Sequence, residues 1–292
     1  MWDTVFYLGA SKMYAIFALL FGLSCYIQHH NQEKKGNDFR PRFAWRMLLL
    51  MGWGLVDLLF FNGDILCTYA VLGLFLIPLV KASDKVLVAV ALLLFCQPIE
   101  IYYLIMGLID PSTQPMDLGL GKHWGLVYEP CAHGGFWDVA VANLKSGLQI
   151  NFGWAIEHGR FTQTLMLFVV GMLVGRKRLF IDEGNHISFW KKVMAYSLVL
   201  FCATQLVLNM APIGQLAPVV SQSLSILITA WRNFAMMSFY VAGITVLYYR
   251  TKGQYLLHQF SYIGKMSLTD YLLQSIVGGF LFYNWGCGLH QY

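Results

Sequence analysis

The chain has 292 residues, of which 58% are hydrophobic and only 12% are charged. Soluble domains carry about 25% charged residues, so this composition excludes an ordinary water-facing fold and predicts a protein that lies in a lipid bilayer. The net charge of +5 would suit nucleic-acid binding. However, the lysines and arginines fall in the breaks between apolar runs, so we expect no nucleic-acid partner.

Apolar runs separated by polar breaks fill most of the chain. A helix that crosses a bilayer needs about 20 apolar residues. In chain order the runs are 13–27, 43–61, 65–80, 86–106, 161–174, 190–210, 231–249 and 260–283. The sequence therefore predicts an all-α, polytopic membrane helical bundle with about eight transmembrane helices, forming a single transmembrane domain over residues 1–292.

Three connections between the runs are distinctive. Asn62-Gly63-Asp64 is a tight-turn signal, so the second and third runs are expected to form an antiparallel hairpin. Residues 111–159 form the longest polar stretch, which we expect to be an extracytoplasmic loop that contains a short helix from Phe136 onward. The uncharged segment 217–228 is expected to lie at an interface or to re-enter the membrane.

The positions of the cations predict the orientation, because short cytoplasmic loops retain lysine and arginine. With the first run starting outside, 15 of the 20 lysines and arginines fall in inside loops. Both termini then lie outside. An outside N-terminus without a signal peptide or an upstream helix leads us to expect an additional N-terminal helix in related chains. Because the chain stops at Tyr292, just after the last run, we also expect related chains to continue farther at the C-terminus.

Ionisable side chains in apolar runs are candidates for function, because each costs roughly 2.5–3.5 kcal/mol at the centre of a membrane helix. Asp57, Glu100 and Asp270 lie inside runs, whereas Asp64, Arg160 and Arg232 lie at predicted outer ends. Structural roles compete with functional ones. Asp64 could cap the third helix, the two arginines could anchor at the headgroups, and buried ion pairs can be purely structural.

These groups predict an outward-opening polar cavity where the first hairpin, the fifth helix and the eighth helix meet. Asp57 or Asp64 is the candidate base, and Arg160 is its candidate charge partner. The candidate substrate-binding residues are Gln163, Arg232, Thr269, Asp270 and Gln274. No metal-ligand spacing such as HExxH or CxxC occurs, so we expect no metal site.

Four short motifs, taken together, resemble one protein family. They are Ser11–Gly22, Asn62–Gly73, Gly159–Arg176 and Gly264–Ser275. In this order they resemble segments of the YeiB-like family of bacterial inner-membrane proteins. Two positions depart from the family pattern: Asp57 stands where the family usually has a histidine, and Asp270 stands where it usually has an asparagine.

The resemblance implies a location and an activity. The YeiB-like family is similar to the transmembrane acyltransferase superfamily, which implies a multi-pass protein of the bacterial inner membrane. It also implies transfer of an acyl group from a cytosolic donor, with acyl-CoA as the candidate, to a carbohydrate-like or lipid acceptor outside. No bound cofactor is implied, and the sequence carries no signal for an oligomeric state. Two alternatives stay open: a transporter or channel that uses the intramembrane carboxylates, and a non-catalytic paralogue.

Overall fold

The computed structural model describes residues 9, 11–180, 186–249 and 251–289. Throughout these ranges the regular elements are helices and no strand occurs, so the predicted all-α class is confirmed. In the same ranges one helix, Ile187–Met210, is long and apolar enough to cross a bilayer. A pair of helices bent by 44° at its break passes the same test as one span. The predicted number of about eight spans goes beyond this finding.

The helices group into two compact units, each assembled from three stretches of the chain. Unit 1 comprises Met1–Phe39, Pro78–Met116 and His158–Leu257, and unit 2 comprises Arg40–Ile77, Asp117–Glu157 and His258–Tyr292. The single transmembrane domain of the sequence analysis stays a prediction.

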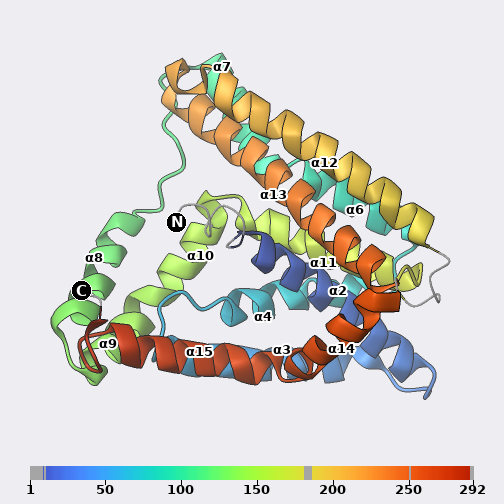
Figure 1. The fold of residues 1–292 in the computed structure, drawn as a ribbon. Helices are drawn as coiled ribbons and strands as arrows, with labels where there is room; N and C mark the ends of the chain where they lie inside the picture. The colour runs from blue at the N-terminus through green and yellow to red at the C-terminus, as the bar shows by residue number, and fades with distance from the viewer. Residues whose placement is uncertain (1–8, 10, 181–185, 250, 290–292) are drawn as a thin grey trace. The chain divides into compact units, whose positions relative to one another are not determined.

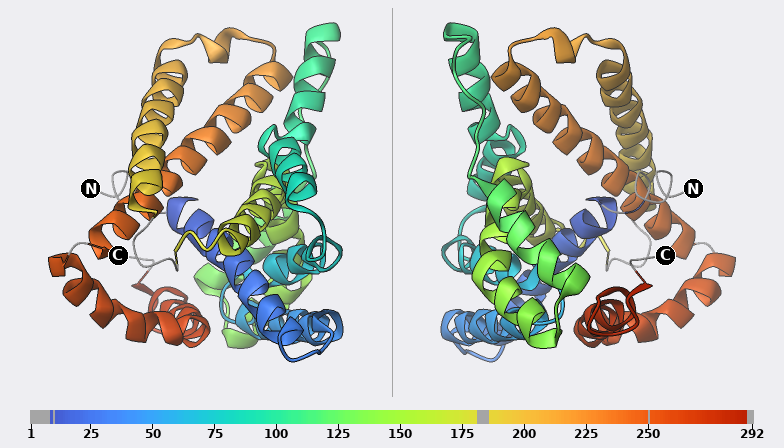
Figure 2. Two further views of the ribbon diagram at one scale, coloured as in Figure 1. Left: turned by 90° about the vertical axis from the view of Figure 1, so that its right-hand side faces the viewer. Right: turned by 90° about the vertical axis from the view of Figure 1, so that its left-hand side faces the viewer.

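Unit 1 is built around two long helix pairs. Its helices are α2 (Ser11–Glu33), α6 (Asp84–Phe95), α7 (Pro98–Ile109), α11 (Arg160–Arg176), α12 (Ile187–Met210) and α13 (Pro218–Tyr248). α11 packs against α2 and α6, and α13 packs against α2, α7 and α12. α12 and α13 form an antiparallel pair joined by the short 3₁₀ turn η3 (Ile213–Gln215), as Figures 1 and 2 show.

Small residues let α2 and α11 approach closely. A Cβ atom on Gly22 would lie 1.9 Å from the carbonyl oxygen of Phe168, and one on Gly171 would lie 2.1 Å from that of Leu19. Because backbone atoms stand in the way, no side chain fits at either position. The sequence pattern of Gly171 and Gly175 is typical of helix packing, and the structure confirms that interpretation.

Unit 2 contains the predicted hairpin and most of the long polar stretch. Its helices are α3 (Phe39–Leu58), α4 (Leu66–Leu74), α8 (Leu120–His133), α9 (Phe136–Ala142), η2 (Asn143–Gly147), α10 (Leu148–Glu157) and α15 (Ser267–Phe282). α5 (Leu76–Leu79) and α14 (Thr251–Lys265) occur where the chain passes from one unit to the other. η2 is a π-helical turn between α9 and α10.

The stretch 111–159 is more structured than a loop. The helix predicted from Phe136 is confirmed, and it continues through the π-turn to Glu157. Val127, Cys131, Val139 and Ile150 form a small buried core of their own, against which aromatic side chains pack. The expected single short helix is therefore wrong in extent, because these apolar residues recur widely enough to bury one another.

Three predicted helices are interrupted. The run 65–80 divides into α4 and α5 at Phe75, because the ring of Pro78 clashes with the carbonyl of the preceding turn. The run 86–106 bends at Gln97, which adopts a left-handed conformation (φ 53°) immediately before Pro98. The run 260–283 divides into α14 and α15 at Met266.

The segment 217–228, in contrast, is more regular than predicted. It forms the first turns of α13, which starts with Pro218 and continues without a break to Tyr248. Proline suits the first helical position, because it lacks only an N–H group that the helix would leave unbonded. The segment is therefore the start of a long helix and not a separate loop, and its expected position at an interface stays a prediction.

Candidate functional site

Asp57 is a buried carboxylate in the last turn of α3. Its side chain is 1% exposed. The Ser275 hydroxyl on α15 donates a hydrogen bond to Asp57 Oδ2 at 3.1 Å. Asp57 Oδ1 is buried and accepts no hydrogen bond from the part of the chain that the structure describes. One oxygen of Asp57 is thus fixed by a hydroxyl, and the other can accept a proton.

Asp64 lies in the turn between α3 and α4 and caps the second of these helices. Its two carboxylate oxygens accept hydrogen bonds from the backbone N–H groups of Leu66 and Cys67, each at 2.9 Å. A Cβ atom on Gly54 of α3 would lie 2.9 Å from Asp64 Oδ2, so the turn packs closely on α3. The capping role is confirmed, and it makes Asp57 the better candidate base of the two.

α15 is held against this turn by a second hydroxyl. The backbone N–H of Ile65 donates to the Tyr271 hydroxyl at 3.2 Å. Tyr271 lies one helical turn before Ser275, whose hydroxyl also donates to the Tyr271 carbonyl at 3.3 Å. Tyr271 and Ser275 therefore bring the two carboxylates of the hairpin to one face of α15.

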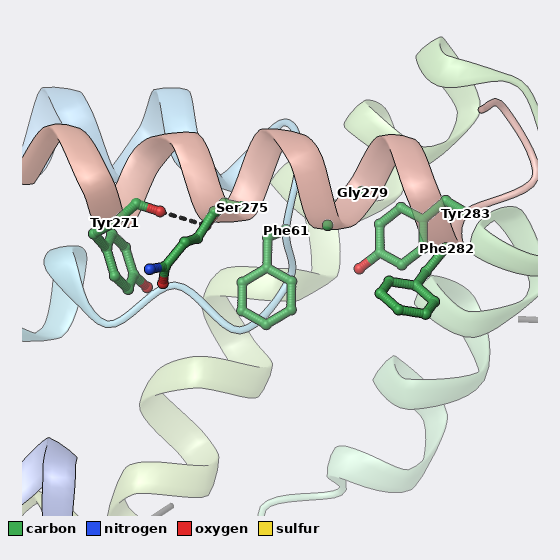
Figure 3. Close-up of a pocket in the computed structure, with 8 residues that line it drawn as sticks. Phe61, Tyr271, Ser275, Gly279, Phe282 and Tyr283 are labelled. Carbon is green, nitrogen blue, oxygen red and sulfur yellow. Dashed lines mark hydrogen bonds between the residues drawn. The ribbon is translucent and has the colours of Figure 1, made fainter. Parts of the chain in front are cut away.

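A cavity of about 390 Å³ follows this face of α15. Figure 3 shows Tyr271 and Ser275 at one end and Phe282 and Tyr283 at the other, with Phe61 opposite the helix between them. Ser275 both lines the cavity and binds Asp57. Its hydroxyl is consequently the polar link between a mostly aromatic cavity and the buried carboxylate.

α15 also carries three residues predicted to bind substrate, Thr269, Asp270 and Gln274. Gln274 lines this cavity and, with Asp270, a more open one of about 740 Å³. Thr269 is exposed and lines neither. Asp270 lies inside the predicted helix 260–283, but this helix breaks at Met266, so Asp270 falls in the first turn of α15. An acidic residue favours that position, where the helix dipole is positive.

Unit 1 holds the predicted cations. The Arg160 guanidinium on α11 donates to Gln163 Oε1 at 3.0 Å, and Gln163 Nε2 donates to the carbonyl of Ala230 at 3.0 Å. The Arg232 guanidinium on α13 donates to Gln205 Oε1 at 3.3 Å. Arg160, Gln163 and Arg232 thus belong to one unit, whereas Asp57 and Asp64 belong to the other. The predicted pairing of Arg160 with a carboxylate of the hairpin stays a prediction.

A conventional ion pair occurs at the opposite end of α11. Asp84, at the start of α6, accepts hydrogen bonds from Arg176 at 3.0 Å and from Lys177 at 2.8 Å. Arg176 also donates to the carbonyls of Val80 and Ala82. Asp84 lies outside the predicted spans 86–106 and 161–174. The hydrogen bonds from Lys177 and Arg176 hold the pKa of the Asp84 carboxyl below its usual range.

Tyr271, Ser275 and Asn233 are candidate site residues that the sequence analysis did not identify. Each is a neutral polar residue within an apolar helix, a signal weaker than charge. Ser275 and Tyr271 lie one helical turn apart, so they share a face of α15. The sequence does not show that this face is the one directed toward Asp57. Over the described ranges, no three His, Cys, Asp or Glu side chains cluster as metal ligands would.

Comparisons with known proteins relate the chain to proteins without an assigned function. Residues 174–292 match the family model described as "Protein of unknown function (DUF418)". The chain is also 25% identical to the "Uncharacterized protein YxaH" of Bacillus subtilis (strain 168), in an alignment that covers 96% of this chain and 68% of that protein. No solved structure matches. The family match begins near the end of α11 and includes the helix that carries Ser275.

Proposed function

We propose that the chain is a multi-pass protein of the bacterial inner membrane that transfers an acyl group to a hydroxyl-bearing acceptor in the cavity along α15. The observation that carries this proposal is the contact between Ser275 and Asp57. It combines a proton-accepting carboxylate, a hydroxyl and a cavity of substrate size within one unit. The resemblance to the YeiB-like family and its acyltransferase relatives supports the same activity.

The membrane location is supported by exposed apolar surface. Only 11% of the apolar window of α12 is buried, and side chains such as Tyr196 and Val199 on this helix are 74% and 68% exposed. A core helix of a soluble protein would be mostly covered. The predicted distribution of 15 cations inside and five outside supports the eight-span topology with both termini outside.

The proposed step needs one base. The acceptor hydroxyl attacks the carbonyl carbon of an acyl thioester, an O–C bond forms, and the C–S bond breaks to release a thiolate, which then takes up the proton that Asp57 has received from the acceptor. The acceptor proton passes through the Ser275 hydroxyl to Asp57. Gln274, at the mouth of the same cavity, would orient the acceptor.

Transport is a second candidate because the helices are broken. α6 and α7 meet at a 44° bend beside the buried Glu100, and α14 and α15 divide at Met266. Transporters often use interrupted helices to bind ions near the middle of the membrane. In this case Asp57 would carry a proton through the membrane and would not receive one from an acceptor.

The test is a transfer assay in sealed vesicles that contain the full chain, with radiolabelled acetyl-CoA on the cytoplasmic side. The wild-type protein should label extracytoplasmic glycan or lipid. Asp57→Asn keeps the shape of the side chain and removes the base, so we expect transfer to fall by about 100-fold or more. Ser275→Ala should fall less, because a water molecule can replace the hydroxyl.

Two controls separate the alternatives. Ile276→Val alters an exposed residue of the same helix that lines neither cavity and should leave transfer unchanged. Full activity in Asp57→Asn would contradict the proposed base, whereas proton uptake without any transfer would support transport. For the topology, a cysteine placed at Gly36 should react with a membrane-impermeant thiol reagent only after the cells are opened. Labelling of this cysteine in intact cells would refute the predicted topology.

A further inference from the structure

Unit 1 contains a polar cavity of its own, separate from the two cavities along α15. The proposed transfer step does not use it. Its volume is about 180 Å³, and α11 and α13 supply most of its walls. The polar lining consists of His158, Arg160, Gln163, Ser225, Thr229 and Asn233. Ser225, Thr229 and Asn233 are spaced four residues apart along α13, so they form a polar stripe on one face of that helix.

Arg160 lines this cavity, and two further cations of unit 1, each on a different helix, interact with it electrostatically. Lys12 of α2 is 3% exposed, and the positive charges of Arg232 and Arg160 both act on it. Arg232 also acts on Arg160. We call Lys12, Arg160 and Arg232 the cation cluster. Like charges at short range in a poorly hydrated place repel, so the cluster creates a potential that attracts an anion.

Arg160 is fixed at the wall of the cavity. Its bond to Gln163, which in turn binds the Ala230 carbonyl, sets the position of the guanidinium. A guanidinium presents a planar fork of N–H donors that matches two oxygens of a phosphate or carboxylate. The cavity therefore offers a positioned anion-binding group and not only a diffuse charge.

Asn233 offers a hydrogen-bond acceptor to the ligand, and an anion without a hydroxyl cannot donate to it. Its side chain is 1% exposed and lines the cavity, and its Oδ1 accepts no hydrogen bond from the residues that the structure describes. A buried acceptor without a donor costs free energy. A ligand hydroxyl would supply the donor, and the hydroxyls of Ser225 and Thr229 on the same stripe can bind further hydroxyls.

We propose that this cavity binds a phosphate group that carries a hydroxyl-bearing substituent, such as glycerol phosphate or a sugar phosphate. Arg160 binds the phosphate, the other two cations of the cluster add to the positive potential around it, and the stripe on α13 selects the substituent. The same chemistry occurs in a soluble phosphate ester and in the headgroup of phosphatidylglycerol. The site does not depend on acyl transfer, because none of its residues takes part in the step at Asp57.

Binding to the purified full chain tests the proposal. In detergent, the Kd of glycerol 3-phosphate should be lower than that of inorganic phosphate and should rise by about tenfold or more in Arg160→Gln. Asn233→Ala should remove the preference for glycerol 3-phosphate over inorganic phosphate and leave phosphate binding intact. Lys122→Gln removes an exposed cation and should change neither value.

A second arm identifies the source of the phosphate. In nanodiscs, native mass spectrometry should show retention of phosphatidylglycerol over phosphatidylcholine if the ligand is a lipid headgroup, and the two variants should lose it. If Arg160→Gln does not accumulate, the proposal is tested by Asn233→Ala alone, which should lose the preference for glycerol 3-phosphate over inorganic phosphate. The proposal is wrong if neither glycerol 3-phosphate nor phosphatidylglycerol binds the wild-type protein better than these variants.

Discussion

The two units hold their buried charges in the same way, although the charges have opposite sign. In unit 2 the carboxylates of Asp57 and Asp64 accept bonds from a serine hydroxyl and from backbone N–H groups. In unit 1 the guanidiniums of Arg160 and Arg232 donate to glutamine side-chain oxygens. Both units therefore use neutral dipoles as hydrogen-bond partners for charge.

The contact of Asp84 with Arg176 and Lys177 shows the alternative. There, opposite charges meet directly, and the Asp84 side chain is 42% exposed. Direct contact with an opposite charge offsets the negative charge of Asp84 and one of the two positive charges beside it, which reduces the field available to a ligand. A charge held by neutral dipoles keeps its field, which suits binding or proton transfer.

The largest expected effect comes from disrupting unit 1 at its closest helix crossing. Gly22→Ala places a Cβ atom against the Phe168 carbonyl and should lower the free energy of unfolding by about 3 kcal/mol. Gly243→Ala, in α13 of the same unit, meets no atom within 4 Å and should stabilise the helix by up to about 1 kcal/mol. Thermal unfolding in detergent measures both changes.

Cysteine labelling shows which unit this disruption affects. Cys25 is buried in unit 1 and Cys67 is buried in unit 2. In single-cysteine backgrounds, Gly22→Ala should raise the labelling rate of Cys25 more than that of Cys67. Equal increases at the two cysteines would mean that the units do not unfold separately, and the comparison between them would lose its basis.

A smaller effect is expected from the cap in unit 2. Asp64→Ala removes both acceptors of the first turn of α4 and should destabilise the protein by about 1–2 kcal/mol. Asp64→Asn keeps one acceptor oxygen and should lose less. Asp270→Asn is a matched control in the first turn of α15, where no side-chain cap bond forms. If Asp64→Ala unfolds like the wild-type protein, the neutral dipoles around Asp64 do not stabilise it.

The smallest effect is expected at the exposed ion pair. Because the pKa of Asp84 is lowered in the folded protein, its contribution to stability is present above the unfolded value of about 3.9 and is lost as the pH falls through the folded value. Asp84→Asn should therefore lower the unfolding temperature slightly at pH 7 and by less at pH 3, where the Asp84 carboxyl begins to protonate. Added salt should reduce the difference. If the decrease in unfolding temperature does not depend on salt, Asp84 would not be stabilised as an ion pair, and it would belong with the charges that neutral dipoles hold.

The sequence predicted the helices better than their interruptions. Apolar runs identify helical stretches because burial and helix formation need the same residues. Prolines lie next to two of the breaks, Pro78 after Phe75 and Pro98 after Gln97, whereas the break at Met266 has no proline beside it and depends on packing. The hairpin at Asn62-Gly63-Asp64 was predictable because a tight turn is a local feature, and so was the cap by Asp64.

The partners in the candidate sites were less predictable. Ser275 meets Asp57 across 218 positions of the chain, and no spacing rule covers that distance. Asp57 itself could be found because an apolar run makes a charge conspicuous. Asn233 could not, because its significance lies in an acceptor without a donor, which depends on every neighbouring side chain. Charge within an apolar helix is visible in sequence, whereas hydrogen-bond satisfaction is a tertiary property.

The crossing of Gly22 with α11 has a consequence for how the chain is made. α2 is complete at Glu33, but its closest partner is complete only when Arg176 has been synthesised. At about 5–20 residues per second, a ribosome needs on the order of ten seconds to supply that partner. During this interval the small-residue face of α2 and the buried Lys12 have no α11 to pack against. Nascent chains paused in this window should therefore be the ones that insertion factors and quality-control proteases recognise.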